Sequence, residues 1–71
     1  MYIIAGKQAE AVEYIVENKL LDAVIISDMQ NILGRDFRNK EVILIGTFAA
    51  RDNIAPMVEE IMARGGKIKY A

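Results

Sequence analysis

Four short strand-like runs alternate with helical or polar segments along this chain of 71 residues. The runs, bounded by Gly, Ser, Asp or charged residues, cover residues 2–5, 23–26, 42–45 and 67–71. Helical periodicity covers residues 8–20 and 54–64, with a shorter helical stretch at 29–33. Strands that are joined through helices run parallel, and their crossovers are right-handed. This order of elements therefore constrains the fold more than any single motif does.

The pattern predicts an α/β fold, a single domain over residues 1–71 with a small four-stranded, mainly parallel sheet. Helices on both faces of the sheet would make a Rossmann-like three-layer sandwich. The runs at 23–26 and 42–45 are apolar at every position, which is typical of central strands that are buried on both faces. Lys67 and Lys69 alternate with apolar residues in the last run, as in an edge strand. Two strand orders, 2-1-3-4 and 3-2-1-4, remain open.

The helical segments suggest which side chains are buried. In the first, one broad stripe is apolar and the opposite side is acidic. The predicted core stripe consists of Ala9, Val12, Ile15, Val16 and Leu20, with Ala11 at its margin, and the acidic stripe of Glu10, Glu13 and Glu17. Tyr14 lies among the glutamates. The predicted stripe of the second helix consists of Ile54, Met57, Val58, Ile61 and Met62.

Helix caps follow from the polar residues that precede each helix. Ser27 or Asp28 can cap the short helix, and Gly34 ends it. Asn53 suits the second helix better than Asp52, because it places Pro56 in the first turn, where a missing N–H costs nothing.

The composition favours self-association. The chain is 54% hydrophobic and contains no Cys and no His. A domain of this size usually needs disulfides, a metal, oligomerisation or very well packed helices and strands. Without Cys or His we expect no disulfide, no metal and no cofactor, which leaves self-association or very close packing. We predict a homodimer, the commonest oligomer, and the alternative is a compact monomer. No apolar run approaches the length of a membrane span and no secretory signal is visible, so we expect a cytoplasmic protein without membrane contact.

The carboxyl ends of the predicted strands hold the residues best suited to bind a ligand. In open parallel sheets, ligands bind beyond these ends near a topological switch point. The candidate ligand-binding residues are Gly6, Lys7, Ser27, Asp28, Gly46, Thr47 and Arg51. Hydroxyls, cations and helix amino ends suit a nucleotide or another anion. The dinucleotide fingerprint and the Walker A spacing are both absent, and a lone glycine after a strand, such as Gly6, is more often only a strand stop.

The sequence gives weaker support for protein binding, nucleic-acid binding and catalysis. Tyr14, Phe37 and Phe48 are candidate interface residues, because aromatic side chains are enriched at protein interfaces. The net charge of −1 and the lack of aromatic residues among the basic ones argue against nucleic-acid binding. An enzyme that acts on phosphate esters through Asp28 and a metal ranks last, because Asp28 has no second carboxylate nearby to share the metal. A Ser-His-Asp triad is excluded because the chain contains no His.

Several short motifs resemble those of a known group of proteins. They are Tyr2-Ile3-Ile4-Ala5-Gly6 followed by Gln8-Ala9, then Ile26-Ser27-Asp28, Leu33-Gly34 and the run from Val42 to Phe48. Together they resemble small orphan proteins encoded by bacteriophages. The resemblance implies a compact Rossmann-like unit with an accessory role inside an infected bacterium, and it assigns no catalytic residue.

We therefore expect a non-enzymatic accessory protein that acts through self-association and through binding a host or phage macromolecule. The alternative is a module that binds a nucleotide or another anion at the carboxyl rim of the sheet.

Overall fold

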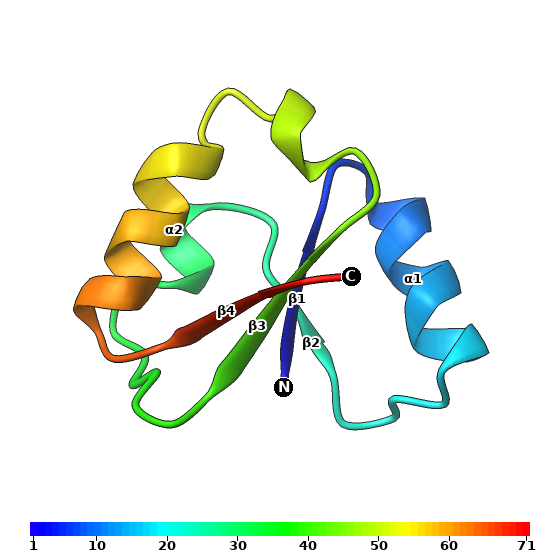
Figure 1. Ribbon diagram of the computed structural model, residues 1–71, viewed down its shortest axis with the longest axis horizontal. Coiled ribbons are helices and arrows are strands. Elements are labelled where there is room, and N and C mark those ends of the chain that lie inside the picture. Colours follow the sequence, from blue (N-terminus) through cyan, green and yellow to red (C-terminus); the bar gives the residue numbers. More distant parts are fainter.

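The sheet is parallel throughout, and its strands lie in the order β2-β1-β3-β4. The computed structural model describes residues 1–71 (Figure 1). The strands are β1 (Tyr2–Ala5), β2 (Val24–Ile25), β3 (Glu41–Ile45) and β4 (Lys67–Tyr70). The helices are α1 (Gln8–Glu17) and α2 (Ile54–Ala63), with two short 3₁₀ helices, η1 (Met29–Asn31) and η2 (Phe48–Ala50). The predicted small α/β fold is confirmed, and the order is one of the two that remained open.

The strand order reverses direction once. From β1 the chain moves outward to β2, then crosses back over β1 to β3 and continues to β4. Because crossovers keep one hand, the reversal places α1 on one face of the sheet and α2 on the other (Figure 1). The topological switch point therefore lies between the carboxyl ends of β1 and β3.

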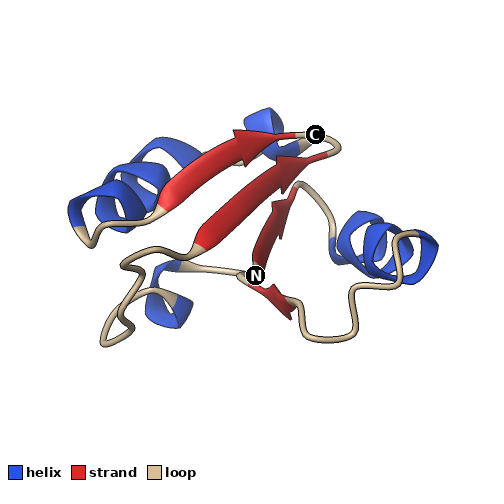
Figure 2. Ribbon diagram, turned by 60° about the horizontal axis from the view of Figure 1, so that its bottom comes forward, coloured by secondary structure: helices blue, strands red, loops and turns tan.

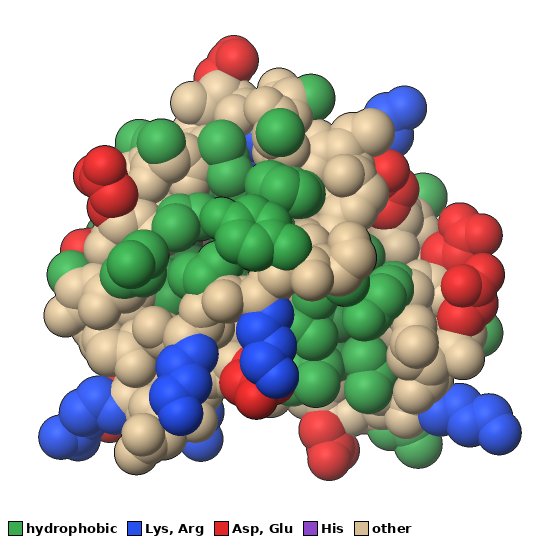
Figure 3. Space-filling model, viewed as in Figure 1, with side chains coloured by type: hydrophobic (Ala, Val, Ile, Leu, Met, Phe, Trp, Pro, Cys, Tyr) green, Lys and Arg blue, Asp and Glu red, His purple; other side chains and the backbone are tan.

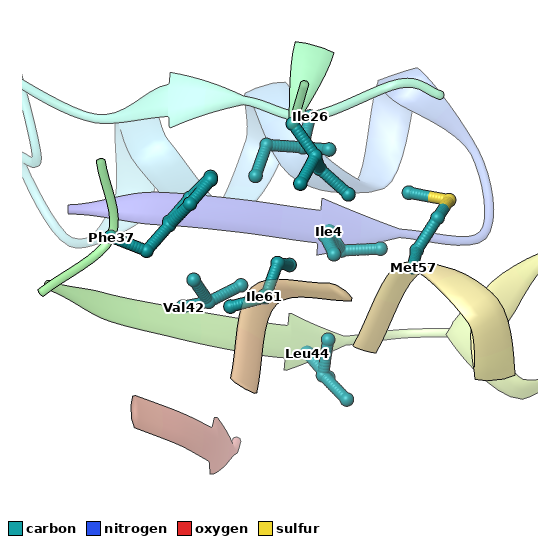
Figure 4. Packing of buried hydrophobic residues seen from close by; sticks show 8 residues of the cluster. Ile4, Ile26, Phe37, Val42, Leu44, Met57 and Ile61 are labelled. Atoms are coloured by element: carbon teal, nitrogen blue, oxygen red, sulfur yellow. The ribbon is translucent and has the colours of Figure 1, made fainter. Parts of the chain in front are cut away.

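Each face of the sheet has its own core. Side chains along β1 and β3 alternate between the faces. The cluster on the α2 face contains eight buried residues, Ile4, Ile26, Ile32, Phe37, Val42, Leu44, Met57 and Ile61 (Figure 4). The cluster on the α1 face contains five, Ile3, Ala5, Ala11, Ile43 and Ile45. The α2 face is the more heavily packed of the two.

Phe37 is the largest fully buried side chain, and it contacts Tyr2 with a ring-centroid distance of 4.8 Å. It enters the α2-face core from the loop between η1 and β3, as Figure 4 shows. The hypothesis that Phe37 offers an interface is therefore wrong. A loop residue between charged neighbours looked accessible, but it fills the space that a longer crossover helix would occupy.

The prediction that the second strand is central is also wrong. β2 is a two-residue edge strand, and Val24 is 38% exposed. The central strands are β1 and β3. The 23–26 run is apolar for another reason: Ile25 packs on the α1-face cluster, while Ile26 is buried on the α2 face just beyond the strand.

Helix α1 is rotated relative to the prediction. Ala11 is fully buried, and Tyr14 and Ile15 are half-buried against the sheet. Val12 and Val16, which were predicted to be core residues, are 46% and 69% exposed. In α2 the prediction is confirmed for Met57 and Ile61, whereas Met62 is exposed. Asn53 is the residue that precedes α2, as predicted.

Helix α1 covers only part of its face of the sheet. It packs on β1, and Figure 2 shows no helix over β4 on that side. Register places Lys67 beside Glu41 and Lys69 beside Ile43, so both lysines point to the α1 face, where they are exposed. We call the β4 side of this face the bare half of the sheet.

Candidate functional site

The loops that follow β1, β2 and β3 meet at one edge of the sheet and hold all the predicted ligand-binding residues. The structure separates these residues into two groups. Gly6, Lys7, Ser27 and Arg51 line one cavity beyond the ends of β1 and β2. Gly46 and Thr47 lie outside this cavity, at the switch point, and Asp28 lines neither place.

The cavity beyond β1 and β2 has a volume of about 270 Å³. Its lining combines an apolar part with polar and cationic groups, and consists of Ala5, Gly6, Lys7, Gln8, Ala11, Ile25, Ile26, Ser27 and Arg51. The first turn of α1 borders it, and the first N–H groups of a helix have no intrahelical acceptor. The cavity therefore presents hydrogen-bond donors and positive charge.

Arg51 reaches into the cavity from the segment between η2 and α2. Its Nη1 donates to the carbonyl oxygen of Ala5 at 3.1 Å, and its Nη2 donates to the carbonyl oxygen of Ser27. These carbonyls end β1 and follow β2, so one half-buried guanidinium links two strand ends. A guanidinium has five N–H donors. The remaining donors of Arg51 are available to an anion.

At the switch point, the carboxylate of Glu10 bridges the two loops. Its Oε1 accepts from the backbone N–H of Lys7 at 2.9 Å and from the hydroxyl of Thr47 at 2.9 Å. Its Oε2 accepts from the backbone N–H of Thr47 at 3.1 Å. The chain thus places its own negative charge where ligands bind in related topologies.

Two glycines allow this close approach. A Cβ on Gly6 would overlap the hydroxyl and the carbonyl of Thr47. Gly46 has a φ of +57°, and a Cβ there would lie 2.5 Å from Oε2 of Glu10. Both glycines therefore serve the packing of the two loops. A bulky residue at Gly6 would disturb the switch point as well as the cavity.

The sequence pattern placed Glu10 in an acidic stripe opposite the predicted core, but in the structure its carboxylate joins the loops that follow β1 and β3. The hydrogen bond from the Thr47 side chain, together with backbone N–H groups of Thr47 and Lys7, holds the pKa of Glu10 below its ordinary value of 4.5. One signal was available in the sequence. Glu10 is the third residue of a helix, the position from which a glutamate reaches back to the preceding backbone N–H.

Asp28 has a structural role. Its Oδ1 accepts from the backbone N–H of Gln30 at 3.0 Å and so caps η1, one of the two caps that the sequence allowed. The side chain of Asn31 accepts from the N–H groups of Ser27 and Asp28 at 2.7 and 3.2 Å. No group of three acidic side chains converges to hold a metal ion.

The remaining candidate interface residues are partly accessible. Tyr14 is half-buried against the α1-face cluster, and it lines a hollow together with Glu10, Glu13 and Glu17. Phe48 is half-buried against the α2-face cluster, and its ring lies 5.8 Å from that of Tyr70, which is 72% exposed.

Comparisons with protein-family models, curated proteins and solved structures found no match to this chain. No helix has the length and apolar character that crossing a bilayer requires.

We predict that Glu10→Gln lowers the melting temperature at pH 7 by a few degrees, because the neutral amide accepts the N–H bonds less strongly. The folded-state pKa of Glu10 lies below 4.5, so its stabilisation is complete above that pH and is lost as the pH falls through the lowered pKa. The difference from the unchanged protein should therefore shrink on acidification. Thermal unfolding monitored by circular dichroism from pH 7 to pH 2 measures this.

The matched control is Glu13→Gln, one turn along on the exposed side of α1. An equal loss of stability in both variants, or a Glu10→Gln effect that does not depend on pH, would contradict the role given to this carboxylate.

Proposed function

We propose that this protein is a non-enzymatic accessory protein of the cytoplasm, phage-encoded, that acts as a homodimer and binds a host or phage macromolecule. The observation that supports this most is the unsatisfied apolar surface on the α1 face. Val12 and Val16 lie one turn apart on α1, and their side chains are 46% and 69% exposed.

Burial of Val12 and Val16 would contribute to association. Fully burying a valine side chain contributes about 1.5 kcal/mol or more. Association costs on the order of 4 kcal/mol or more in lost translational and rotational freedom. Two valines from each copy would therefore offset much of this cost before any polar contact is counted. A chain without disulfides gains stability from such an interface.

A second surface suits the macromolecular partner. Tyr70, Phe48 and Met62 project around the free edge of β4 on the α2 side, and Tyr70 and Met62 are exposed. Figure 3 shows a continuous apolar area there. Exposed aromatic residues with adjacent methionine are typical of protein interfaces.

We predict that light scattering and sedimentation find a dimer at micromolar concentrations, and that Val16→Glu converts it into a monomer with unchanged circular dichroism. Leu33→Glu is the matched control, since Leu33 is a comparably exposed apolar residue that follows η1 on the opposite face. A monomer at every concentration tested would refute the proposal.

A second candidate function, binding of a nucleotide or another phosphate-bearing anion, is favoured by the cavity at Arg51. Lys7, Arg51 and Ser27 converge there, from three different loops. Arginine binds phosphate through paired N–H donors, and the amino end of α1 adds a favourable dipole.

For this candidate we predict a rise in melting temperature with nucleotides or inorganic phosphate. At a ligand concentration about ten times Kd the stabilisation is about 1.4 kcal/mol, which raises Tm by several degrees in a domain of this size. Lys7→Ala should reduce the shift, whereas Lys40→Ala, which removes the same charge just before β3, should not. The absence of a shift at millimolar ligand, or equal losses in both variants, would exclude this candidate.

A further inference from the structure

The turn that follows α2 lies beside the loop that precedes β3, although the two are far apart in the sequence. Nη1 of Arg64 donates to the carbonyl oxygen of Arg35 at 3.2 Å. A Cβ on Gly65 would lie 3.0 Å from Cγ of Arg38, and Gly65 has a φ of +87°, which favours glycine. Each segment precedes a strand, so they meet at the amino edge of the sheet, opposite the cavity at Arg51.

The three arginines of these segments line a hollow with a volume of about 520 Å³, which we call the arginine hollow. Asp36, Ala63 and Gly65 complete its lining, and Asp36 contributes the only carboxylate. The arginine hollow shares no lining residue with the cavity at Arg51. In Figure 3, Lys and Arg side chains gather at the lower left, where Figure 1 shows the turn from α2 to β4. Positive charge is therefore concentrated here, in a chain whose net charge is −1.

Two of the arginines are held in place and keep unused donors. A guanidinium has five N–H donors. Nε and Nη2 of Arg38 donate to the carboxylate of Asp36 at 2.9 to 3.2 Å, which leaves Nη1 without an acceptor. The guanidinium of Arg35 makes no hydrogen bond and lies over the ring of Tyr2, 5.8 Å from its centroid. Because neighbouring groups already position these side chains, less entropy is lost when a ligand binds.

The third arginine, Arg64, has a donor that the chain does not satisfy. Its Nη1 and Nη2 donate to the carbonyl of Arg35 and to the carboxylate of Glu60, but its Nε is buried without an acceptor. A buried donor of a charged group that lacks a partner costs free energy. An anion in the arginine hollow would offset this cost through its charge, without needing to contact Nε.

The carboxyl end of α2 borders the arginine hollow, and free carbonyl oxygens at a helix end carry partial negative charge. The carbonyl oxygens of Glu60, Ile61 and Met62 each accept a backbone N–H from residues 64–66. These hydrogen bonds reduce the repulsion that an anion would otherwise meet. The guanidinium groups therefore dominate the electrostatics of the hollow.

We propose that the arginine hollow binds the terminal phosphate of a phosphomonoester. Arginine binds phosphate through paired N–H donors. A phosphomonoester has a charge of about −1.5 to −2 at pH 7 and three acceptor oxygens, which suits three guanidinium groups better than the two oxygens of a carboxylate do. A nucleic-acid backbone is less suitable, because no aromatic side chain lines the hollow to stack on a base. This site is separate from the proposed dimer surface and from the cavity at Arg51.

An NMR titration of the ¹⁵N-labelled protein with methyl phosphate tests the proposal residue by residue. The backbone amides of Arg35, Arg38 and Gly65 should shift saturably, beyond the effect of sodium chloride at equal ionic strength. Dimethyl phosphate, a diester with one negative charge, should bind the arginine hollow with a Kd several-fold higher. The amides of Gly6 and Ser27 report the cavity at Arg51 in the same titration, so the two sites are followed separately.

One variant removes a guanidinium from the arginine hollow, and a matched variant removes a charge elsewhere. Arg35→Gln should raise the Kd for methyl phosphate about tenfold, and it should fold because the Arg35 side chain is exposed and makes no hydrogen bond. The control, Lys7→Gln, removes one positive charge at the opposite edge of the sheet. It should leave the Kd at the arginine hollow unchanged.

Three results would overturn the inference. Shifts at Arg35, Arg38 and Gly65 no larger than those with sodium chloride would show that phosphate does not bind there. Equal Kd values for methyl and dimethyl phosphate would show that the hollow does not select a monoester. Equal effects of Arg35→Gln and Lys7→Gln would reduce the binding to general charge attraction. Shifts confined to Gly6 and Ser27 would support the cavity at Arg51 and refute the arginine hollow.

Discussion

A parallel sheet has two apolar faces, and this chain has enough helix to cover only one of them fully. On the α2 face, α2, η1 and the buried ring of Phe37 enclose a cluster of eight residues. On the other face the ten-residue helix α1 packs on β1. It does not cover β4, whose Lys67 and Lys69 point to this face. Val12 and Val16 are exposed on α1, and exposed apolar side chains that lie together usually mark an interaction site. The accessible surfaces and the proposed assembly both follow from this imbalance.

The second constraint is the bridge between Glu10 and Thr47. It joins residues 37 positions apart and fixes both the rotation of α1 and the spacing of the two loops. The carboxylate fills the switch point, so the cationic cavity lies to one side, beyond β1 and β2, where Arg51 links the strand ends. The same bridge turns Val12 and Val16 away from their own sheet. A single polar contact therefore shapes both surfaces to which we assign a function.

Local patterns in the sequence predicted the element order, the parallel sheet, the cap at Asp28, and the buried residues Met57 and Ile61. They also placed Asn53 directly before α2, although its side chain makes no capping hydrogen bond. Periodicity could not choose between two apolar stripes on α1, because the long-range contact of Glu10 makes the choice. Nor could apolarity identify the edge strand, since helices and loops bury residues on both sides of β2. The cavity brought together Gly6, Lys7, Ser27 and Arg51 as the parallel topology predicted. The loops at the switch point pack closely because Gly6 lies against Thr47 and Gly46 lies against Glu10. No local sequence motif predicts these long-range contacts.

The proposed homodimer uses the exposed apolar side of α1, where Val12 and Val16 lie. An isotope-filtered NOE experiment on a mixture of labelled and unlabelled chains tests it directly, because it detects only contacts between copies. We predict intermolecular cross-peaks from the methyl groups of Val12 and Val16. Intermolecular cross-peaks confined to other surfaces, or none at millimolar concentration, would contradict it.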